Sequence, residues 1–473
     1  MRAEFPKISP LPEAAAGAGR PVRRIFANLG LLLTGRAVAG ILSVIYMVVA
    51  ARALGPRDYG VLVLVHAYVV AVGGIIGFPT WHAIIRYGAK PLAEGDGRRL
   101  GELLRLFAAV ESAAGVLAVA LAALLVPWVG PKLGWSAEAQ SFGVPYSLAI
   151  LAAVRTTPAG FLQLVGRLDL VAAHAAVAPS VRLAGALAAS AAGGELEYFL
   201  VAWLAAAIAE WASMWLIGLW IAIRHVPARQ LLSRFRPPAR PEPGLWRFML
   251  IANADVTLAD FAGRAAPLAV GWILGPAAAG LFAVAQRATV ILAQPAQILG
   301  QAAYSELAKL VATGAPSELL RRALLGCIAV SLAIAGPIIL LLAFFSADIV
   351  LLLGGPAFAG AAPVLIWLAA ARTFGLIGPP CSAALIAMGT PGFALLANAG
   401  LAVLLLPFLP LLSVWLGLIG TGAHALIQAV LTALLLSALV WAVSGRATKR
   451  SSDEALEEIE VLRIEAAEPR DLS

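Results

Sequence analysis

The chain of 473 residues is 61% hydrophobic and only 13% charged. Apolar runs of roughly 20 residues recur along it, and a run of that length is enough to cross a bilayer. This composition excludes a soluble domain and indicates a polytopic membrane protein. The net charge of +8 is concentrated between the apolar runs, so its distribution predicts the orientation of the chain in the membrane.

Twelve apolar segments follow one another along the chain. The first 24 residues are polar and basic, and the apolar stretch after them is too long for the core of a signal peptide, so we expect a retained first helix. The segments cover residues 27–52, 59–80, 102–128, 140–164, 168–192, 196–223, 247–273, 278–300, 322–345, 361–388, 391–414 and 416–443.

The only long internal polar connection divides these segments into two groups of six. The sequence therefore predicts an all-α membrane protein whose twelve transmembrane helices form two pseudo-symmetric six-helix bundles around a central cavity. Lys and Arg gather in the N-terminal arm, the even-numbered connections and the stretch after the last helix, which predicts that both termini are cytoplasmic. The expected units are a cytoplasmic arm (1–26), a first half (27–223), a basic cytoplasmic linker (224–246), a second half (247–443) and an acidic cytoplasmic tail (444–473).

The motif L-G-P-x-x-x-G occurs twice, 220 positions apart, each time between the first and second helices of a half. Its first glycine can take a positive φ and end a helix, and its proline suits the first turn of the next helix. Its second glycine lets a neighbouring helix approach closely. We expect a hinge at the same place in both halves, made by Gly55, Pro56, Gly60, Gly275, Pro276 and Gly280.

The segments around these hinges resemble a known family. "LSVIYMVVAARALGPRDYGVL" at 42–62, "LGPAAAGLFAVAQR" at 274–287 and "LGQAAYSELAKL" at 299–310 are similar to the oligosaccharidyl-lipid (O-antigen and exopolysaccharide) flippases. These belong to the multidrug/oligosaccharidyl-lipid/polysaccharide exporter superfamily, which also contains the MATE multidrug exporters. The resemblance covers essentially the whole chain and identifies the family better than its cargo.

This resemblance implies transport rather than catalysis. The cargo would be an oligosaccharide joined through pyrophosphate to a polyprenyl lipid. It would be moved by alternating access from the cytoplasmic to the periplasmic leaflet of the bacterial inner membrane, for O-antigen or exopolysaccharide biosynthesis. Membrane lipid, a polysaccharide polymerase and other export components would be its partners, and no cofactor, metal or nucleic acid is expected.

Charged residues inside the apolar segments are the candidate cargo site. Each Arg at the bilayer centre costs ~2.5–3.5 kcal/mol if it faces lipid, so most must face the bundle interior. Planar guanidinium groups bind phosphate oxygens in pairs, which suits the diphosphate of the implied cargo. The six arginines are Arg36, Arg155, Arg182, Arg264, Arg287 and Arg372. Arg36 could instead extend toward the cytoplasm, and ion pairing within the bundle is a competing explanation for the others.

Helical spacing adds neutral residues to this cavity. One polar face runs along the seventh segment and another along the eighth, although such faces can also be seams between helices. Glu111 and Asp260 could carry a coupling proton or sodium ion, or could serve only as partners of arginines. The neutral candidates are Asn253, Thr257, Gln294 and Gln301.

Two other classes of protein compete with a flippase. A membrane-bound glycosyltransferase or ligase would need a catalytic outer loop or paired acids, and the sequence has neither these nor a nucleotide-binding or hydrolase motif. We therefore do not expect an enzyme. An ion-coupled MATE-type multidrug exporter is the serious alternative, but it would be expected to present acids to cationic drugs rather than an excess of arginines.

Overall fold

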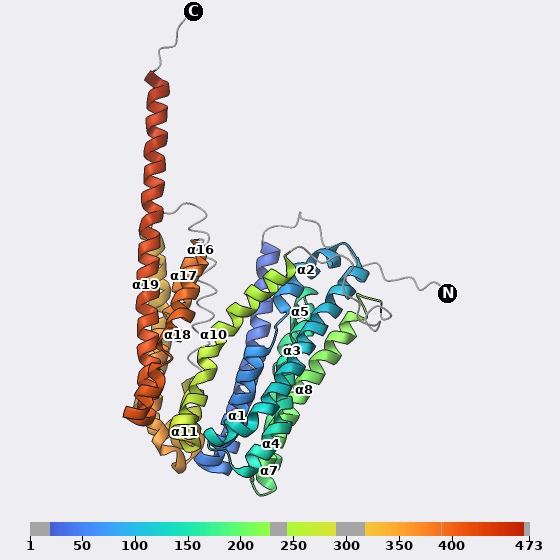
Figure 1. The fold of residues 1–473 in the computed structure, drawn as a ribbon. Coiled ribbons are helices and arrows are strands. Elements are labelled where there is room, and N and C mark those ends of the chain that lie inside the picture. The colour runs from blue at the N-terminus through green and yellow to red at the C-terminus, as the bar shows by residue number, and fades with distance from the viewer. Residues whose placement is uncertain (1–18, 228–243, 290–316, 389, 468–473) are drawn as a thin grey trace, which may run out of the picture.

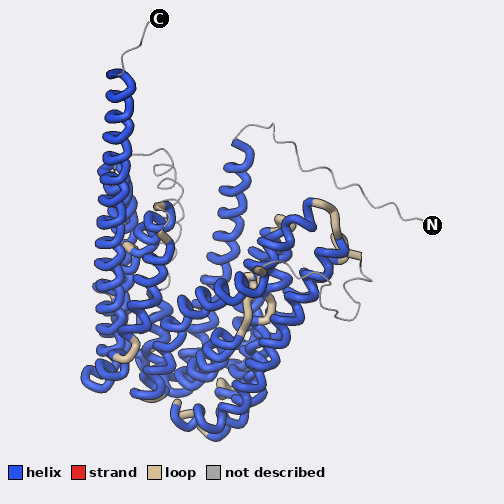
Figure 2. The backbone as a smooth tube through the Cα atoms, turned by 45° about the horizontal axis from the view of Figure 1, so that its top comes forward, coloured by secondary structure: helices blue, strands red, loops and turns tan. Residues whose placement is uncertain are grey.

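The computed structural model describes residues 19–227, 244–289, 317–388 and 390–467. Within these ranges the helices form two groups, which meet at one end and diverge toward the other (Figure 1). All the secondary structure drawn for them is helical (Figure 2). Helices suit a bilayer because each satisfies its own backbone polar groups where no water can do so.

The first group runs from α1 to α8. Its helices are α1 (Gly19–Ile76), α2 (Trp81–Ala93), α3 (Gly97–Lys132), α4 (Ala137–Tyr146), the 3₁₀ helix η1 (Ser147–Ala153), α5 (Thr156–Leu164), α6 (Leu168–His174), α7 (Val177–Ala191) and α8 (Leu196–Ala222). Side chains cap the N-termini of α3 and α4. Asp96 accepts a hydrogen bond from the amide of Arg99, and Ser136 accepts one from the amide of Ala139.

The second group runs from α10 to α19. Its helices are α10 (Leu245–Leu274), α11 (Pro276–Thr289), α13 (Ser317–Phe344), α14 (Ser346–Gly354), the 3₁₀ helix η3 (Pro356–Ala361), α15 (Ala362–Gly375), α16 (Gly378–Ala387), α17 (Pro391–Leu395), the π-helical turn η4 (Leu396–Gly400), α18 (Leu401–Leu405) and α19 (Phe408–Ala467). The start of α1 and the end of α19 lie at the same end of the molecule, where the two groups diverge (Figure 1).

The chain is a multi-pass membrane protein. Seven helices of the described residues are long and apolar enough to cross a bilayer, and a pair bent by 77°, Gly336–Phe344 with Ser346–Gly354, would make an eighth. Two of the seven, Thr34–Ile76 and Phe408–Ser444, are each interrupted by a glycine of positive φ, Gly55 and Gly417. Residues 290–300 of the predicted eighth segment lie outside the described residues, so the total of twelve stays a prediction.

Both predicted hinges have the same backbone conformation. Gly55 has φ 70° and ψ 177°, and Gly275 has φ 86° and ψ 174°. The predicted positive φ is therefore confirmed, but ψ is extended rather than left-handed helical. A proline follows each glycine and disfavours helical ψ in the residue before it. The resulting combination is one that essentially only glycine adopts.

The two copies of the motif pack against each other. A Cβ added at Gly60 would overlap the carbonyl oxygen of Pro276, and one added at Gly280 would overlap the carbonyl oxygen of Pro56. The prediction that these glycines allow a close approach is confirmed, and the partner of each copy proves to be the other copy. The repeated motif therefore makes a reciprocal contact between the two groups of helices.

An apolar core surrounds this contact. The largest buried cluster takes side chains from both groups, among them Leu64 of α1, Phe199 of α8, Val284 of α11 and Leu365 of α15. Close packing of this kind transmits displacement rather than absorbing it. The end of the molecule at which the motifs cross is therefore where the two groups are joined.

Helix α10 links the groups a second time. It runs obliquely from α11 to α2 (Figure 1), and its first residues, Leu245 and Met249, are buried in a cluster built from α2, α3, α5 and α8. Phe248 lies edge-on to Tyr87 and under the guanidinium of Arg86, 4.6 Å from its ring centroid. The N-terminal end of α10 thus packs on the first group, although its sequence belongs to the second half.

Candidate functional site

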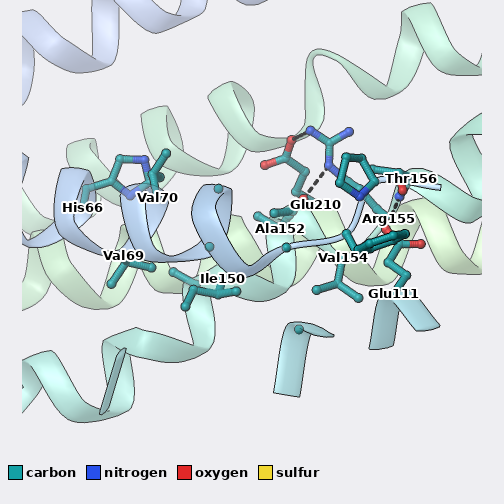
Figure 3. A pocket seen from close by; sticks show the side chains of 18 of the residues that line it. His66, Val69, Val70, Glu111, Ile150, Ala152, Val154, Arg155, Thr156 and Glu210 are labelled. Carbon is teal, nitrogen blue, oxygen red and sulfur yellow. Dashed lines mark hydrogen bonds and ion pairs between the residues drawn. The ribbon is translucent and has the colours of Figure 1, made fainter. Parts of the chain in front are cut away.

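A cavity of about 370 Å³ opens within the first group of helices. The break at Gly55 divides α1 into a first arm (19–54) and a second arm (56–76). Five elements supply the polar lining of the cavity: the second arm of α1, α3, the junction of η1 with α5, α7 and α8. The ionic groups on its wall are Glu111, Arg155, Arg182 and Glu210, and Figure 3 shows three of them together with His66. We call this cavity the first-half pocket.

The wall of the pocket includes a break in a membrane-spanning helix. Between η1 and α5 the backbone leaves helical geometry at Val154 (ψ 63°) and Arg155 (φ −148°). The freed carbonyl of Val154 accepts a hydrogen bond from Trp215 Nε1 at 2.7 Å, and that of Ala152 accepts one from Arg155 Nε at 2.6 Å. Interrupted helices occur at membrane depth where they line a cavity and their polar groups find partners.

Glu111 caps the helix that follows this break. Its two carboxylate oxygens accept hydrogen bonds from the amides of Thr156 and Thr157, at 2.5 and 2.8 Å, and its side chain is buried. These amides are the first free donors of α5, where the helix dipole also favours an anion. The sequence left two roles open for Glu111, an ion carrier or an arginine partner. In the described residues its carboxylate is hydrogen-bonded to backbone amides and forms no ion pair with an arginine.

Arg155 is neutralised inside the pocket. Its Nη2 lies 2.7 Å from Oε1 of Glu210 on α8, as Figure 3 shows. The carbonyl of Glu210 also contacts His174 Nε2 at 2.9 Å. For Arg155 the competing explanation of an internal ion pair therefore applies, although the residue does line the first-half pocket.

Arg182 has a different environment, made of aromatic rings. Its guanidinium carbon lies 5.1 Å from the ring centroid of Trp203 and 5.7 Å from that of Tyr46. Its Nη1 donates to the Tyr46 hydroxyl at 3.2 Å, and its Nη2 lies 3.4 Å from His66 Nε2. Its Nε is buried without a hydrogen-bond partner, and no carboxylate of the described residues forms an ion pair with it.

The tautomer of His66 follows from this network. Because Arg182 can only donate, His66 Nε2 must accept, and the ring proton lies on Nδ1. Nδ1 then donates to the hydroxyl of Tyr146, 3.0 Å away. His66 thus contributes to holding the guanidinium, as a neutral acceptor.

Arg287 approaches the same region from the second group. It lies on α11, half-buried, within electrostatic range of the hydroxyls of Tyr46 and Tyr59. Tyr46 therefore has an arginine of each group within electrostatic range: Arg182 of α7, which contacts it, and Arg287 of α11.

A second cavity, of about 580 Å³, lies within the second group and is lined by Arg372 of α15. We call it the second-half pocket. Arg36, by contrast, is exposed on the first arm of α1 and lines neither cavity. Asn253 is described, and its Oδ1 is buried without a hydrogen-bond partner. The side chains of the remaining predicted residues lie outside the described residues: Thr257, Asp260, Arg264, Gln294 and Gln301.

Sequence reasoning missed the aromatic part of the site. Tyr46 and Trp203 come from α1 and α8, and nothing in their local sequence indicates that they face one arginine. Tyr46 does lie in the segment that resembles the flippases, nine residues before the first hinge glycine. That position was the one available signal.

The sequence was compared with family models and with curated proteins. No family model matches the chain. It is 27% identical over 300 residues to the inner membrane protein YghQ of Escherichia coli K12, a match that covers 63% of this chain and 82% of that protein. The chain is thus a distant homologue of a protein named for the inner membrane.

Solved structures show the fold. The inward-facing conformation of a multidrug resistance MATE family transporter of the MOP superfamily matches 88% of this chain and 99% of its own, with a TM-score of 0.70 and 15% identity. The lipid II flippase MurJ in an inward closed conformation matches 93% and 94%, with a TM-score of 0.65 and 13% identity. An outward-facing MATE structure matches 91% and 97%, with a TM-score of 0.60 and 16% identity. The chain has the MATE and MurJ fold.

Proposed function

We propose that this protein is a flippase that moves a polyprenyl-diphosphate-linked oligosaccharide across the inner membrane for the synthesis of a surface polysaccharide. One observation carries the proposal: Arg182 contacts Tyr46, Arg287 of the other half lies within electrostatic range of the same hydroxyl, and neither arginine forms an ion pair with a carboxylate of the described residues. Buried arginines in a membrane mark substrate pathways. Two such cations at the junction of the halves fit a doubly charged linker.

The aromatic surroundings of Arg182 suit it to bind phosphate. Ring faces attract the guanidinium without neutralising it, whereas a carboxylate would. The Nε of Arg182 is buried without a hydrogen-bond partner, so this donor is not used within the protein. A guanidinium bound in this way can donate two parallel hydrogen bonds to a phosphate group.

Transport would follow from the position of the two arginines on different halves. In the proposed cycle the chain makes twelve passes, and the end at which the halves diverge faces the cytoplasm with both termini. A diphosphate reaches Arg182 and Arg287 from that side while the polyprenyl chain stays in lipid. The reciprocal motif contact at the other end then parts, and the glycan is released to the periplasm.

A MATE-type drug exporter is the second candidate, because two carboxylates line the first-half pocket. A cationic drug would need at least one of them. Glu111 is held by two backbone amides and Glu210 by Arg155, so neither is available without breaking an existing contact. The absence of a free carboxylate in the first-half pocket, among the described residues, favours an anionic cargo over a cationic drug.

Equilibrium binding to the purified protein distinguishes the two candidates. The probes are a short-chain polyprenyl diphosphate and ethidium, and the variants are Arg182→Gln, Arg182→Lys and Arg287→Gln. The control is Arg36→Gln, which removes an equal charge outside both pockets. We expect each Gln variant of the pair to weaken diphosphate binding by about ten- to a hundredfold, the value of a charge-assisted hydrogen bond, and Lys to restore part of it.

Arg36→Gln should bind the diphosphate like the unmodified protein. Melting temperatures of all variants separate a loss of binding from a loss of folded protein. Tight binding of ethidium with no binding of the diphosphate would support the exporter and refute the flippase.

A further inference from the structure

The second-half pocket has a lining unlike that of the first. Its polar walls come from α11, α15, α16, η4 and α19, and Arg372 is its only charged residue among the described residues. Amides and hydroxyls supply the rest, including Gln286, Asn398 and Gln428. Its volume of about 580 Å³ falls within the roughly 300–1,000 Å³ of small-molecule sites.

Several of these groups have unused hydrogen-bonding capacity. The hydroxyl of Thr421 and Nε2 of His424 each donate to a backbone carbonyl, of Leu418 at 2.7 Å and of Leu405 at 2.9 Å. In contrast, the side chains of Arg372, Gln286 and Gln428 make no hydrogen bond to another described residue. Three neighbouring donors that are not used internally, within a cavity, indicate a ligand that presents acceptors.

Asn398 adds an acceptor to this set. Its Nδ2 donates to Ser382 Oγ at 3.1 Å and to the carbonyl of Ala394 at 2.8 Å. Both amide hydrogens are therefore used, and Oδ1 remains. A surface that offers neutral donors, a neutral acceptor and one guanidinium matches a ligand with several hydroxyls and one carboxylate.

Helix α11 connects the second-half pocket with the proposed diphosphate site. Gln286 lines the second-half pocket, and the next residue, Arg287, belongs to the proposed diphosphate pair. The Cα atoms of consecutive residues are about 3.8 Å apart. A sugar attached to a diphosphate at Arg287 therefore lies near one wall of the second-half pocket.

We propose that the second-half pocket binds an acidic sugar of the transported glycan, with Arg372 pairing to its carboxylate and the amides of Gln286 and Gln428 contacting its hydroxyls. This rests on the proposed function, because it assumes a glycan that carries a diphosphate. It deepens that function by naming the class of sugar: one that bears a carboxylate.

Binding of two synthetic probes tests the assignment. Both are polyprenyl-diphosphate-linked disaccharides, one ending in glucuronic acid and the other in glucose. The unmodified protein should prefer the acidic probe by about tenfold or more, the value of one charge-assisted pair. Arg372→Gln should abolish the preference and bind the glucose probe normally, and Arg372→Lys should keep part of it. Arg182→Gln should weaken both probes equally.

A second variant and a third probe separate the possible failures. Gln428→Ala should weaken both disaccharide probes and leave the binding of sugar-free polyprenyl diphosphate unchanged. Equal affinity of the unmodified protein for the two disaccharides, or an Arg372→Gln variant that loses the sugar-free diphosphate, would overturn the inference and leave the proposed function standing. Failure to bind any of the three probes would overturn both.

Discussion

Glu111 connects two parts of the first half that are 45 residues apart in sequence. Its carboxylate satisfies two amides at the start of α5, in the wall of the first-half pocket. The contact explains how a membrane helix can be interrupted beside a cavity without exposing unpaired backbone donors.

We therefore predict that Glu111→Ala destabilises the protein. Each of the two amides left unpaired should cost about 1–3 kcal/mol. Glu111→Gln should cost about half as much, because its carbonyl oxygen still accepts one of the two bonds. Thermal unfolding in detergent micelles measures the difference. If Glu111→Ala kept its melting temperature and lost only ion-dependent transport, Glu111 would be a coupling residue and not a cap.

Gly55 and Gly244 allow a second test at single residues. Both have positive φ, and a Cβ at either position would meet no atom within 4 Å, so their substitution tests backbone conformation alone. Gly244 is left-handed helical (ψ 2°), whereas Gly55 has ψ 177°. Asn tolerates the first conformation but not the second.

Gly244→Asn should accordingly cost less than about 1 kcal/mol, and Gly55→Asn about 1–3 kcal/mol. The amount of folded protein and its melting temperature measure both effects. Equal stability of the two variants would show that the conformation at the hinge needs no glycine.

At the scale of elements, the crossing of the two L-G-P-x-x-x-G motifs explains why the chain repeats them. Each supplies a glycine with no side chain and a proline carbonyl for the other to contact. The symmetry of the contact follows from the symmetry of the sequence. It also makes this end of the molecule sensitive to a single methyl group.

We predict that Gly60→Ala or Gly280→Ala shifts the protein away from this conformation, because each added Cβ overlaps a carbonyl oxygen of the opposite motif. Gly40→Ala and Gly326→Ala are matched controls in α1 and α13, where an added Cβ meets nothing within 4 Å. Spin labels at positions 57 and 277, both exposed, report the separation of the motifs once Cys327 and Cys381 are replaced.

The Gly60 and Gly280 variants should show a longer label distance or a new population at longer distance. The control variants should give the distance of the unmodified protein. An unchanged distance in Gly60→Ala would mean that the contact can relax locally and does not hold the two halves together.

At the scale of the whole molecule, the sequence predicts those features that depend on residues close together in the chain, and not those that depend on packing between distant helices. The positive φ of the hinge glycines depends on neighbouring residues, and it appears as expected at Gly55 and Gly275. The apolar segments are also local features: seven helices of the described residues are long and apolar enough to cross a bilayer, while the total of twelve stays a prediction. The partners of buried ions were not predictable in this way. Arg155 meets Glu210 and Glu111 meets Thr156 only after helices distant in sequence pack together.

Two features of the arrangement differ from a simple picture of two separate bundles. The N-terminal end of α10 packs on the first group, because Leu245 and Met249 bury themselves there. The start of α1 projects beyond both groups in Figure 2, and Arg36 is exposed on this helix. Both Arg36 and Arg182 lie in apolar segments of the sequence, so counting charges in these segments does not distinguish them. Only the packing of the helices shows that Arg182 lies against the rings of Tyr46 and Trp203.

The central claim is that this fold moves a lipid-linked diphosphate and not a cationic drug. It is tested most directly with proteoliposomes that contain the purified protein and a fluorescent polyprenyl-diphosphate disaccharide, by measuring how fast the probe becomes accessible on the opposite leaflet. We predict that the unmodified protein accelerates this movement, that Arg182→Gln and Arg287→Gln slow it about ten- to a hundredfold, and that Arg36→Gln does not. The account would be contradicted if the diphosphate probe moved no faster than in protein-free liposomes while the same protein-containing vesicles transported ethidium.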